Sequence, residues 1–482
     1  MKKLLLLLIL ALTLVQFSAP SIAGGSGEFV QTESLRLQFS RQGDLLRTEA
    51  CFPSCTDGQT NTRVLSGSDG MFVFPDEGQD KLQVKRSRES NETVLEFITP
   101  NGQVARRWQV PDTGWVISLS VSGKSSARIA SGADFRPQPS SGFGNLLEQS
   151  RYLFFDGSDV TIAGLDDGDE VSLASADWFG FRNRFWAAMV LSDSSLPLSA
   201  KTGEGVEDAE VSMQFDGSGQ HNLSLYLGPV EPTALAQSAP ELENLMYSGL
   251  WFWLRWICQA LYYLLGAIEK VIPSWGLAVM VLSVIVGLLM RPLSKIADRL
   301  QDQVHATDAR LAPALAEIKK NNKGAEQSEK IIALYKSEGV HPLYSLKSML
   351  GVFVVIPVFI GAFDMLAENI HLSGESFLWI ADLSHPDAFM ALPFSLPFFG
   401  GYLNLLPFIM TGLSFVASKL HSHPDMNLLQ QRKQSRNLVL MSLGFLVLFY
   451  TFPAGMVLYW TTNNLISVIK MGWKRRKMVV AE

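Results

Sequence analysis

The sequence predicts a multi-domain protein: an all-β sandwich domain outside the cytoplasm, followed by an α-helical polytopic membrane domain with five core transmembrane helices and a cytoplasmic helical hairpin. Three observations support this. Short alternating runs fill residues 29 to about 230, long apolar runs follow residue 249, and the charge divides between these parts. Residues 24–248 carry 31 Asp and Glu against 17 Lys and Arg, whereas residues 249–482 carry 15 against 21. The sequence contains no basic patch interleaved with aromatic residues, so it does not indicate direct nucleic-acid recognition.

The first 23 residues are typical of a secretory signal. Met1-Lys2-Lys3 precedes an apolar run over residues 4–15, and small residues lead to Ala23. The run is shorter than the roughly 20 residues of a full span. We therefore favour a cleaved signal peptide over a retained N-terminal anchor, and either one places residue 24 outside the cytoplasm.

Residues 24–231 are predicted to form the β-sandwich domain. Alternating runs at residues 35–39, 94–97, 115–121 and 224–227 are separated by clusters of Gly, Asp, Asn and Ser, which favour turns. Many short strands of this kind are typical of a sandwich or an open barrel. No nucleophile motif, metal-ligand cluster or nucleotide loop occurs in the sequence, so we expect neither an enzyme nor a cofactor.

Two features of this domain leave alternatives. Cys51 and Cys55 stand in an exported segment, where disulfides persist, so one interpretation is a small local disulfide between them. A redox pair is the other interpretation, and the C-x-x-x-C spacing disfavours it. The aromatic segment 177–188 favours a core strand pair with two surface arginines, and a ligand or partner surface is the alternative. Cys258 lies in an apolar helix and is expected to be inert.

The distribution of Lys and Arg orients the membrane domain, residues 275–470. Ten of them lie between Arg291 and Lys347, and none lies between Lys347 and Lys419. Because basic residues near spans mark the cytoplasmic side, we place a hairpin at residues 295–339 in the cytoplasm. The predicted spans are residues 275–293, 349–367, 401–418, 437–451 and 454–469, and the basic tail 471–482 stays inside. This helical hairpin is either a solvated coiled hairpin or a docking surface.

Residues 232–274 are interpreted as a connector and an interfacial helix. The aromatic run 250–268 is long enough to span, but a span there would place the basic hairpin outside. We therefore expect an amphipathic helix that lies flat at the outer interface, where Trp and Tyr are favoured.

Several motifs together resemble the YidC/Oxa/Alb family, in its Gram-negative YidC form. Trp275-Gly276-Leu277 through Arg291-Pro292-Leu293-Ser294 resembles the first core span and its exit. Further motifs are Ala333-Leu334-Tyr335-Lys336, Val340-His341-Pro342-Leu343, Pro357-Val358-Phe359, the segment 377–384, the segment 452–460 and Asn464-Leu465. Segments 177–188 and 227–229 are similar to the family's external domain. The resemblance covers most of the chain.

The resemblance implies a membrane protein insertase and chaperone of the bacterial cell inner membrane. In this family five spans enclose a groove that is open to the cytoplasm and to lipid, and a positive residue in it attracts acidic segments of nascent membrane proteins. Expected partners are these clients, the Sec translocon, a ribosome or targeting factor at the hairpin and tail, and anionic lipids. The domain before the spans would be periplasmic and the C-terminus cytoplasmic.

The sequence departs from the family at the groove. The family's arginine position holds Gly287, and Arg291 follows one turn later. Arg291 either reaches the groove from nearer the cytoplasm or is an ordinary interfacial arginine. Lys347 either replaces the missing charge or marks a helix start. Ser283, Trp460 and Asn464 complete the groove and client-contact candidates.

Two other functions compete with an insertase. A non-inserting assembly or scaffold factor would keep the fold with a weakened groove, which Gly287 and the apolar Val355 permit. A periplasmic carbohydrate receptor would use the membrane part only as an anchor, for which a single span is enough.

Overall fold

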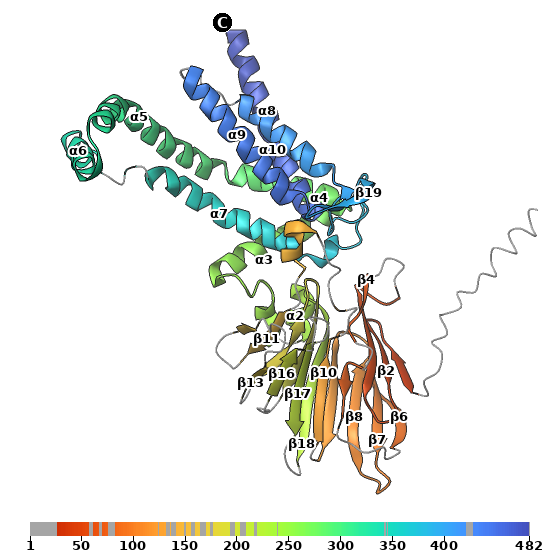
Figure 1. Cartoon of the computed structure of the whole chain (residues 1–482). Coiled ribbons are helices and arrows are strands. Elements are labelled where there is room, and N and C mark those ends of the chain that lie inside the picture. Colours follow the sequence, from red (N-terminus) through yellow and green to blue (C-terminus); the bar gives the residue numbers. More distant parts are fainter. Residues whose placement is uncertain are drawn as a thin grey trace, which may run out of the picture.

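The computed structural model describes residues 27–56, 61–66, 70–75, 82–123, 125–131, 135, 141–148, 151–155, 160–163, 170–173, 177–192, 198–202, 209–215, 219–238, 240–341, 344, 346–420 and 428–481. The expected signal segment, residues 1–23, lies outside them. A β-sandwich is followed by a helical region, which confirms that part of the predicted fold class. The helices stand on one end of the sandwich (Figure 1).

Two antiparallel sheets form the sandwich, each with nine strands among the described residues. One has the order β1-β2-β3-β5-β10-β17-β16-β13 with β4 paired to β3, and the other β12-β11-β14-β15-β18-β9-β8-β7-β6. The strands of the N-terminal half are β1 Glu28–Gln31, β2 Leu35–Phe39, β3 Leu45–Phe52, β4 Asn61–Val64, β5 Phe72–Val73, β6 Gln83–Glu89, β7 Glu92–Ile98, β8 Val104–Pro111, β9 Val116–Ser122 and β10 Ser125–Ala130. Those of the C-terminal half are β11 Arg151–Phe155, β12 Val160–Ala163, β13 Glu170–Leu173, β14 Trp178–Arg182, β15 Trp186–Ser192, β16 Leu198–Thr202, β17 Ala209–Phe215 and β18 Gln220–Pro229.

The alternating sequence produces the core between the two sheets. In β2 the apolar residues Leu35, Leu37 and Phe39 are buried while the residues between them are partly exposed. The ring of Trp108 from the facing sheet lies 5.3 Å from that of Phe39, and its indole N–H donates to the carbonyl of Gly43 at 2.9 Å. Cys51 and Cys55 form a disulfide at the end of β3.

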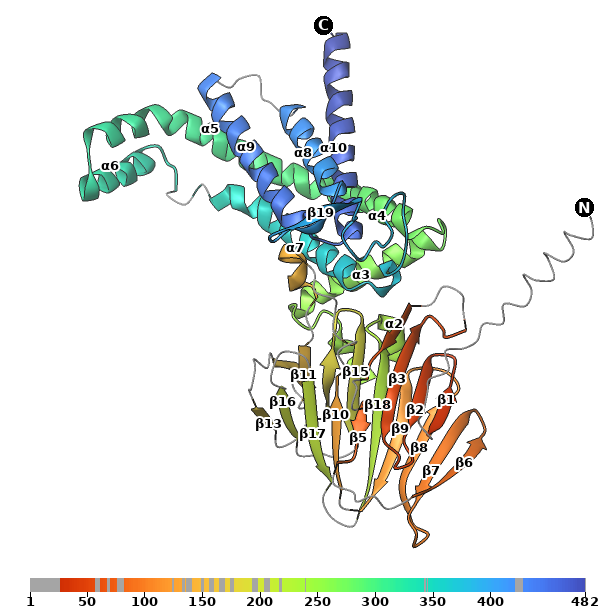
Figure 2. The same cartoon turned by 45° about the vertical axis from the view of Figure 1, so that its right-hand side comes forward.

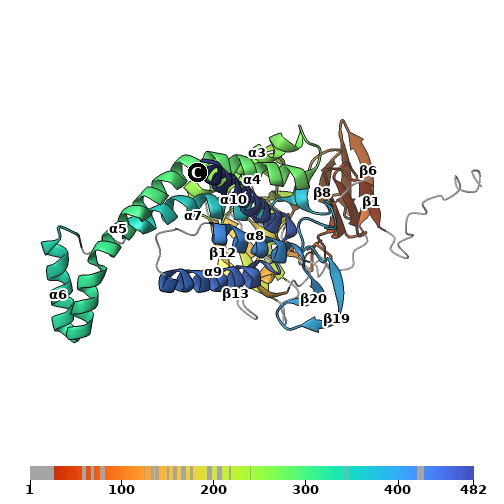
Figure 3. The ribbon, with the colours of Figure 1, turned by 90° about the horizontal axis from the view of Figure 1, so that it is seen from above.

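The remaining elements connect to and build the helical region. The short helix η2 Gly142–Leu146 lies against this region, and the amide of its Gly144 donates to Thr451 Oγ1 at 3.0 Å. The other elements are α2 Pro232–Ser238, η3 Pro240–Leu245, α3 Phe252–Glu269, α4 Trp275–Leu289, α5 Arg291–Asn321, α6 Gly324–Ser337, α7 Leu346–Ala367, η4 Ile370–Leu372, β19 Met390–Leu396, β20 Gly400–Leu403, α8 Leu406–Leu420, α9 Leu428–Phe449 and α10 Ala454–Ala481. Helices α8, α9 and α10 rise away from the sandwich (Figure 2). Helices α5 and α6 form an arm that extends sideways (Figure 3).

The helix boundaries differ from the predicted ones in three places. Helix α5 begins at Arg291 and continues through Pro313, so the arm includes the predicted exit of the first span. The span predicted at residues 401–418 begins as strand β20, and its helix starts at Leu406. Helix α9 begins at Leu428, nine residues before the predicted start. Charge and hydropathy located the segments but not the points at which the backbone changes from strand to helix.

Among the described residues, no single helix passes a length and hydropathy test for crossing a membrane. The pair Trp275–Leu289 and Arg291–Ala297, bent by 42°, passes it together. Ile356–Ala367, Leu406–Ala417 and Val439–Phe449 are shorter apolar helices.

Candidate functional site

A cavity of about 570 Å³ lies among α4, the start of α5, α7 and α10. One wall is apolar and aromatic, with Val286, Val358, Phe359 and Trp460. The ring of Phe359 lies 4.5 Å from that of Trp460, so this wall is packed between α7 and α10. The complete lining is Val286, Gly287, Met290, Arg291, Lys295, Val358, Phe359, Tyr459, Trp460, Asn463, Ser467 and Lys470.

The charged side chains of this lining are all basic. Arg291, Lys295 and Lys470 line it, and among the side chains that the structure describes no Asp or Glu does so. Arg291 and Lys295 are four residues apart, which places them on one face of α5, and Lys470 approaches from α10. The cavity therefore combines an apolar wall with a cluster of three positive charges.

The backbone break between α4 and α5 positions Arg291. Helix α4 ends at Leu289, and the amide of Met290 still donates to the carbonyl of Val286 at 2.9 Å. Pro292 stands at the first positions of α5, where a missing N–H is tolerated. Helix α5 therefore starts in a new direction, and Arg291 is exposed at the cavity.

The structure brings three of the six predicted groove residues to this cavity: Gly287, Arg291 and Trp460. At Gly287 an added Cβ would have Asn463 Oδ1 as its nearest neighbour, at 3.6 Å, so the missing side chain leaves open space in the wall. Lys347 lies in the first turn of α7, and its side chain is outside the described ones.

Ser283 and Asn464 hold helices together instead of lining the cavity. The hydroxyl of Ser283 is buried and donates to the carbonyl of Tyr459 at 2.9 Å, which joins α4 to α10. The amide of Asn464 donates to Ser414 Oγ at 2.6 Å and to the carbonyl of Met410 at 3.3 Å, so it faces α8. Its neighbour Asn463 lines the cavity.

Among the lining residues that the sequence interpretation missed, four have charged side chains or small polar ones: Lys295, Asn463, Ser467 and Lys470. Helical spacing groups them on common helix faces, but only the packing of the helices shows that these faces line the cavity. Gly287, Arg291 and Lys295 follow one another at intervals of four, and Asn463, Ser467 and Lys470 follow at intervals of four and three. These two rows of side chains lie close together because α4 packs against α10.

The loop between η4 and Asp387 closes the end of the bundle nearest the sandwich. An added Cβ at Gly276 would lie 2.2 Å from the ring of Phe377, so the loop packs directly on the backbone of α4. His371 stacks on Trp275 with ring centroids 4.8 Å apart. The amide of Gly455, in the first turn of α10, donates to the carbonyl of Leu383 at 2.8 Å.

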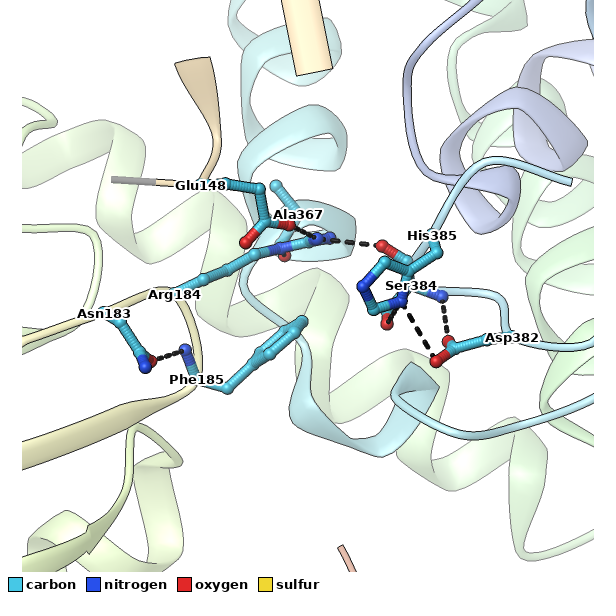
Figure 4. Close-up of polar contacts among 8 residues, drawn as sticks. All are labelled: Glu148, Asn183, Arg184, Phe185, Ala367, Asp382, Ser384 and His385. Carbon is cyan, nitrogen blue, oxygen red and sulfur yellow. Dashed lines mark hydrogen bonds and ion pairs between the residues drawn. The ribbon is translucent and has the colours of Figure 1, made fainter. Parts of the chain in front are cut away.

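The sandwich reaches this loop through the two arginines of segment 177–188, and the prediction that they lie on the surface is wrong. Arg182 and Arg184 are both 4% exposed. Arg184 Nη1 contacts Glu148 Oε1 at 2.6 Å and donates to the carbonyl of Ser384 at 2.8 Å, and its Nε donates to the carbonyl of Ala367 (Figure 4). Arg182 pairs with Glu368 at 3.0 Å. The arginines are buried because they join the sandwich to the end of α7.

Asp382 organises the part of the loop that Arg184 contacts. Its carboxylate accepts from the amide of Ser384 at 2.7 Å and lies 3.1 Å from His385 Nδ1 (Figure 4). Burial opposes ionisation of Asp382, but the hydrogen bonds from His385 and Ser384 outweigh it and hold the pKa of this carboxyl below its usual value. The turn at residues 382–385 is thereby fixed with the Ser384 carbonyl toward Arg184.

Comparison with known proteins identifies a family model and several relatives that are similar to this chain. The family model described as "60Kd inner membrane protein" matches residues 267–481. Membrane protein insertase YidC of Pseudomonas syringae pv. syringae (strain B728a) is 27% identical over 334 residues, which are 67% of this chain and 54% of that protein. The protein of the same name from Ralstonia nicotianae (strain ATCC BAA-1114 / GMI1000) is 31% identical over 258 residues, 53% of this chain and 41% of the relative.

A solved structure described as "Active YidC insertase crystal structure with the first transmembrane domain resolved" matches 97% of this chain and 98% of its own, with 18% identity and a TM-score of 0.37. The chain spans about half the length of the curated relatives it matches. The family is one of insertases and not of enzymes. The matched family model covers residues 267–481 and the named relatives are YidC membrane protein insertases, so this part of the chain is similar to that family.

Proposed function

We propose that this protein is a membrane protein insertase and chaperone, which inserts nascent inner-membrane proteins and helps them fold. The observation that carries the proposal is the cavity with an apolar wall beside Arg291, Lys295 and Lys470. Positive charge in a membrane domain is costly and serves a function in most cases. Here it would attract an acidic or polar segment of a client while the aromatic wall receives the apolar part.

The proposal needs no covalent chemistry. A polar segment crosses a membrane at lower cost where water and polar groups reach part of the way, because its backbone groups remain hydrogen-bonded for longer. The three basic side chains that line the cavity would supply such an environment there. The loop that packs on Gly276 would keep the end of the bundle nearest the sandwich closed.

The proposed placement is multi-pass in the inner membrane, with the five spans of the sequence interpretation, the sandwich in the periplasm and the C-terminus in the cytoplasm. The basic arm α5–α6 and the tail after Lys470 would then face the ribosome or a targeting factor and anionic lipid headgroups. The Sec translocon is the proposed partner for larger clients.

Arg291 provides the direct test. A Gram-negative host depleted of its resident insertase would express the intact chain, Arg291→Ala or Arg299→Ala, and insertion of a small single-span client would be measured. Arg299 is the matched control, because it lies on α5, is exposed and does not line the cavity. We expect rescue by the intact chain and by Arg299→Ala, and loss of rescue with Arg291→Ala at equal expression.

Equal rescue by Arg291→Ala and the intact chain would make Arg291 an orientation signal only. Failure of a well-expressed intact chain would favour the second candidate, a non-inserting assembly factor. The open space at Gly287 is the observation behind that candidate, because the wall there lacks a side chain that could hold a client. Photo-crosslinking from position 287 to a nascent client would then be absent.

A further inference from the structure

A second surface, at the sandwich end of the helical region, is apolar and exposed. Residues 388–418 contain no Asp, Glu, Lys, Arg or His. They include the hairpin β19–β20, in which Phe394 is 60% and Tyr402 53% exposed. A surface with so many large exposed apolar side chains marks a site that a protein or a membrane covers.

A neighbouring loop adds to the same surface. Phe377 and Ile380 pair in a tight turn that holds Leu378 at φ +55°, a backbone conformation that costs energy for a residue with a branched side chain, and leaves it 75% exposed. The ring of Trp379 meets that of Phe389 edge-on at 6.3 Å. We call this surface the aromatic patch, with the members Leu378, Trp379, Phe389, Met390, Phe394 and Tyr402.

The aromatic patch is continuous with the exposed apolar sides of α8 and α9. The hydroxyl of Tyr450, which follows α9, donates to the carbonyl of Tyr402 at 3.0 Å. The ring of the same tyrosine lies 6.0 Å from Phe408 in the first turn of α8. Phe408 of α8 and Leu440 of α9 are themselves exposed. The hairpin lies where these two helices end, on the side of the sandwich (Figure 2).

The backbone of the hairpin limits the depth at which it could lie in a bilayer. Only three residue pairs connect its strands: Met390 with Leu403, Ala391 with Tyr402, and Leu396 with Gly400. The edges of a two-stranded sheet leave amide and carbonyl groups without partners, which the hydrocarbon core does not tolerate. Aromatic side chains at helix ends are favoured in the headgroup layer, where water and lipid carbonyls satisfy such groups.

We propose that the aromatic patch inserts into the headgroup layer of the membrane leaflet on the sandwich side and anchors the ends of α8 and α9 there. The occupant is lipid. The patch adjoins the exposed apolar sides of α8 and α9, which the proposed placement puts in the bilayer, so lipid is the molecule that reaches it. The proposal rests on the membrane placement given under Proposed function and goes beyond it, since it assigns a lipid contact to a surface away from the cavity.

The test uses the full chain with single fluorophores. Cys258→Ala removes the free buried thiol, and an environment-sensitive dye is attached at Phe394→Cys, Leu440→Cys or Asn101→Cys. Asn101 is exposed in the turn between β7 and β8, at the far end of the sandwich (Figure 1). The protein is reconstituted into phosphatidylethanolamine and phosphatidylglycerol vesicles that carry a spin label either next to the headgroup or near the end of the acyl chain.

We expect dye at residue 394 to shift to shorter wavelength and to be quenched more by the shallow spin label than by the deep one. Dye at residue 440, which lies inside the predicted span 437–451, should be quenched by the lipid spin labels, and dye at residue 101 by neither. No quenching at residue 394 with normal quenching at residue 440 would overturn the patch proposal alone. No quenching at residue 440 would overturn the membrane placement and the patch proposal with it. A wavelength shift at residue 394 that depends on protein concentration, without lipid quenching, would assign the patch to a second copy of the chain and reject lipid.

Discussion

At the scale of single residues, the one-residue difference between Asn463 and Asn464 decides which amide lines the cavity. Successive residues of a helix point about 100° apart. Asn463 therefore faces the cavity while Asn464 donates to Ser414 and Met410 of α8. Sequence motifs identified the segment, but only the packing of α10 against α8 determined which side chain points inward.

Asn464→Ala and Asn463→Ala should therefore have different effects. Asn464→Ala removes a hydrogen bond between helices and should lower the free energy of unfolding by about 1 kcal/mol, whereas Asn463→Ala should leave stability nearly unchanged. Thermal unfolding in detergent measures this, and client insertion in the depleted host measures function. A stability loss with Asn463→Ala equal to that with Asn464→Ala would contradict the assignment.

Arg184 illustrates the cost of a buried charge. Arg184→Ala leaves the partly buried Glu148 without its partner and removes donors from the carbonyls of Ala367 and Ser384, so we expect a loss of roughly 3–5 kcal/mol in the free energy of unfolding. Arg88→Ala is the control, because its pair with Asp112 is exposed and should be worth about 0–1 kcal/mol. Equal effects of the two changes in chemical denaturation would mean that Arg184 does not hold the sandwich to α7.

At the scale of elements, close contact between α4 and the loop after η4 closes the sandwich end of the bundle. Gly276 permits this contact, because any side chain there would enter the space of the Phe377 ring. Gly266 of α3 is partly buried, but it has nothing within 4 Å of an added Cβ and serves only as a helix residue. Close packing therefore requires a glycine at position 276, whereas no contact requires one at position 266.

Gly276→Ala should consequently destabilise the protein by about 1–3 kcal/mol through overpacking. Gly266→Ala should stabilise it by up to about 1 kcal/mol, because alanine favours helix. Thermal unfolding of both variants in the same detergent gives the comparison. A stabilised Gly276→Ala would show that the loop is not packed on α4 as described.

At the scale of the whole molecule, His371 lies where the sandwich, α3 and α4 meet. Its ring packs on Trp275 of α4 and meets Phe52 of β3 edge-on at 5.1 Å. Its Nε2 lies 3.0 Å from the hydroxyl of Tyr262, which donates to Glu231 at 2.7 Å. Burial lowers the pKa of His371, and the charge of Glu231 opposes this only in part.

The lowered pKa predicts the pH range in which this junction weakens. Above about pH 6.5 the imidazole is neutral in both the folded and the unfolded chain, so the shift contributes nothing. As the pH falls below that value, the unfolded chain takes up the proton first, and stability decreases until the lower folded-state pKa is reached. Unfolding in denaturant at about pH 7.5 and about pH 5.5 should show a smaller acid-induced loss for His371→Gln than for the intact chain. Identical losses would exclude His371 as the cause.

The sequence by itself determined the order of the two parts, four of the sandwich strands, the approximate positions of the main helices, the basic arm and the resemblance to the family. These features depend on local periodicity, charge and hydropathy, which are properties of short stretches of the sequence. The tertiary structure alone decided that Arg182 and Arg184 are buried, that Asn463 and Lys470 line the cavity, and that Ser283 and Asn464 do not. The physical reason is that burial and cavity lining depend on contacts between segments far apart in the chain, such as Arg184 with Glu148 and Ser384, and no local pattern contains that information.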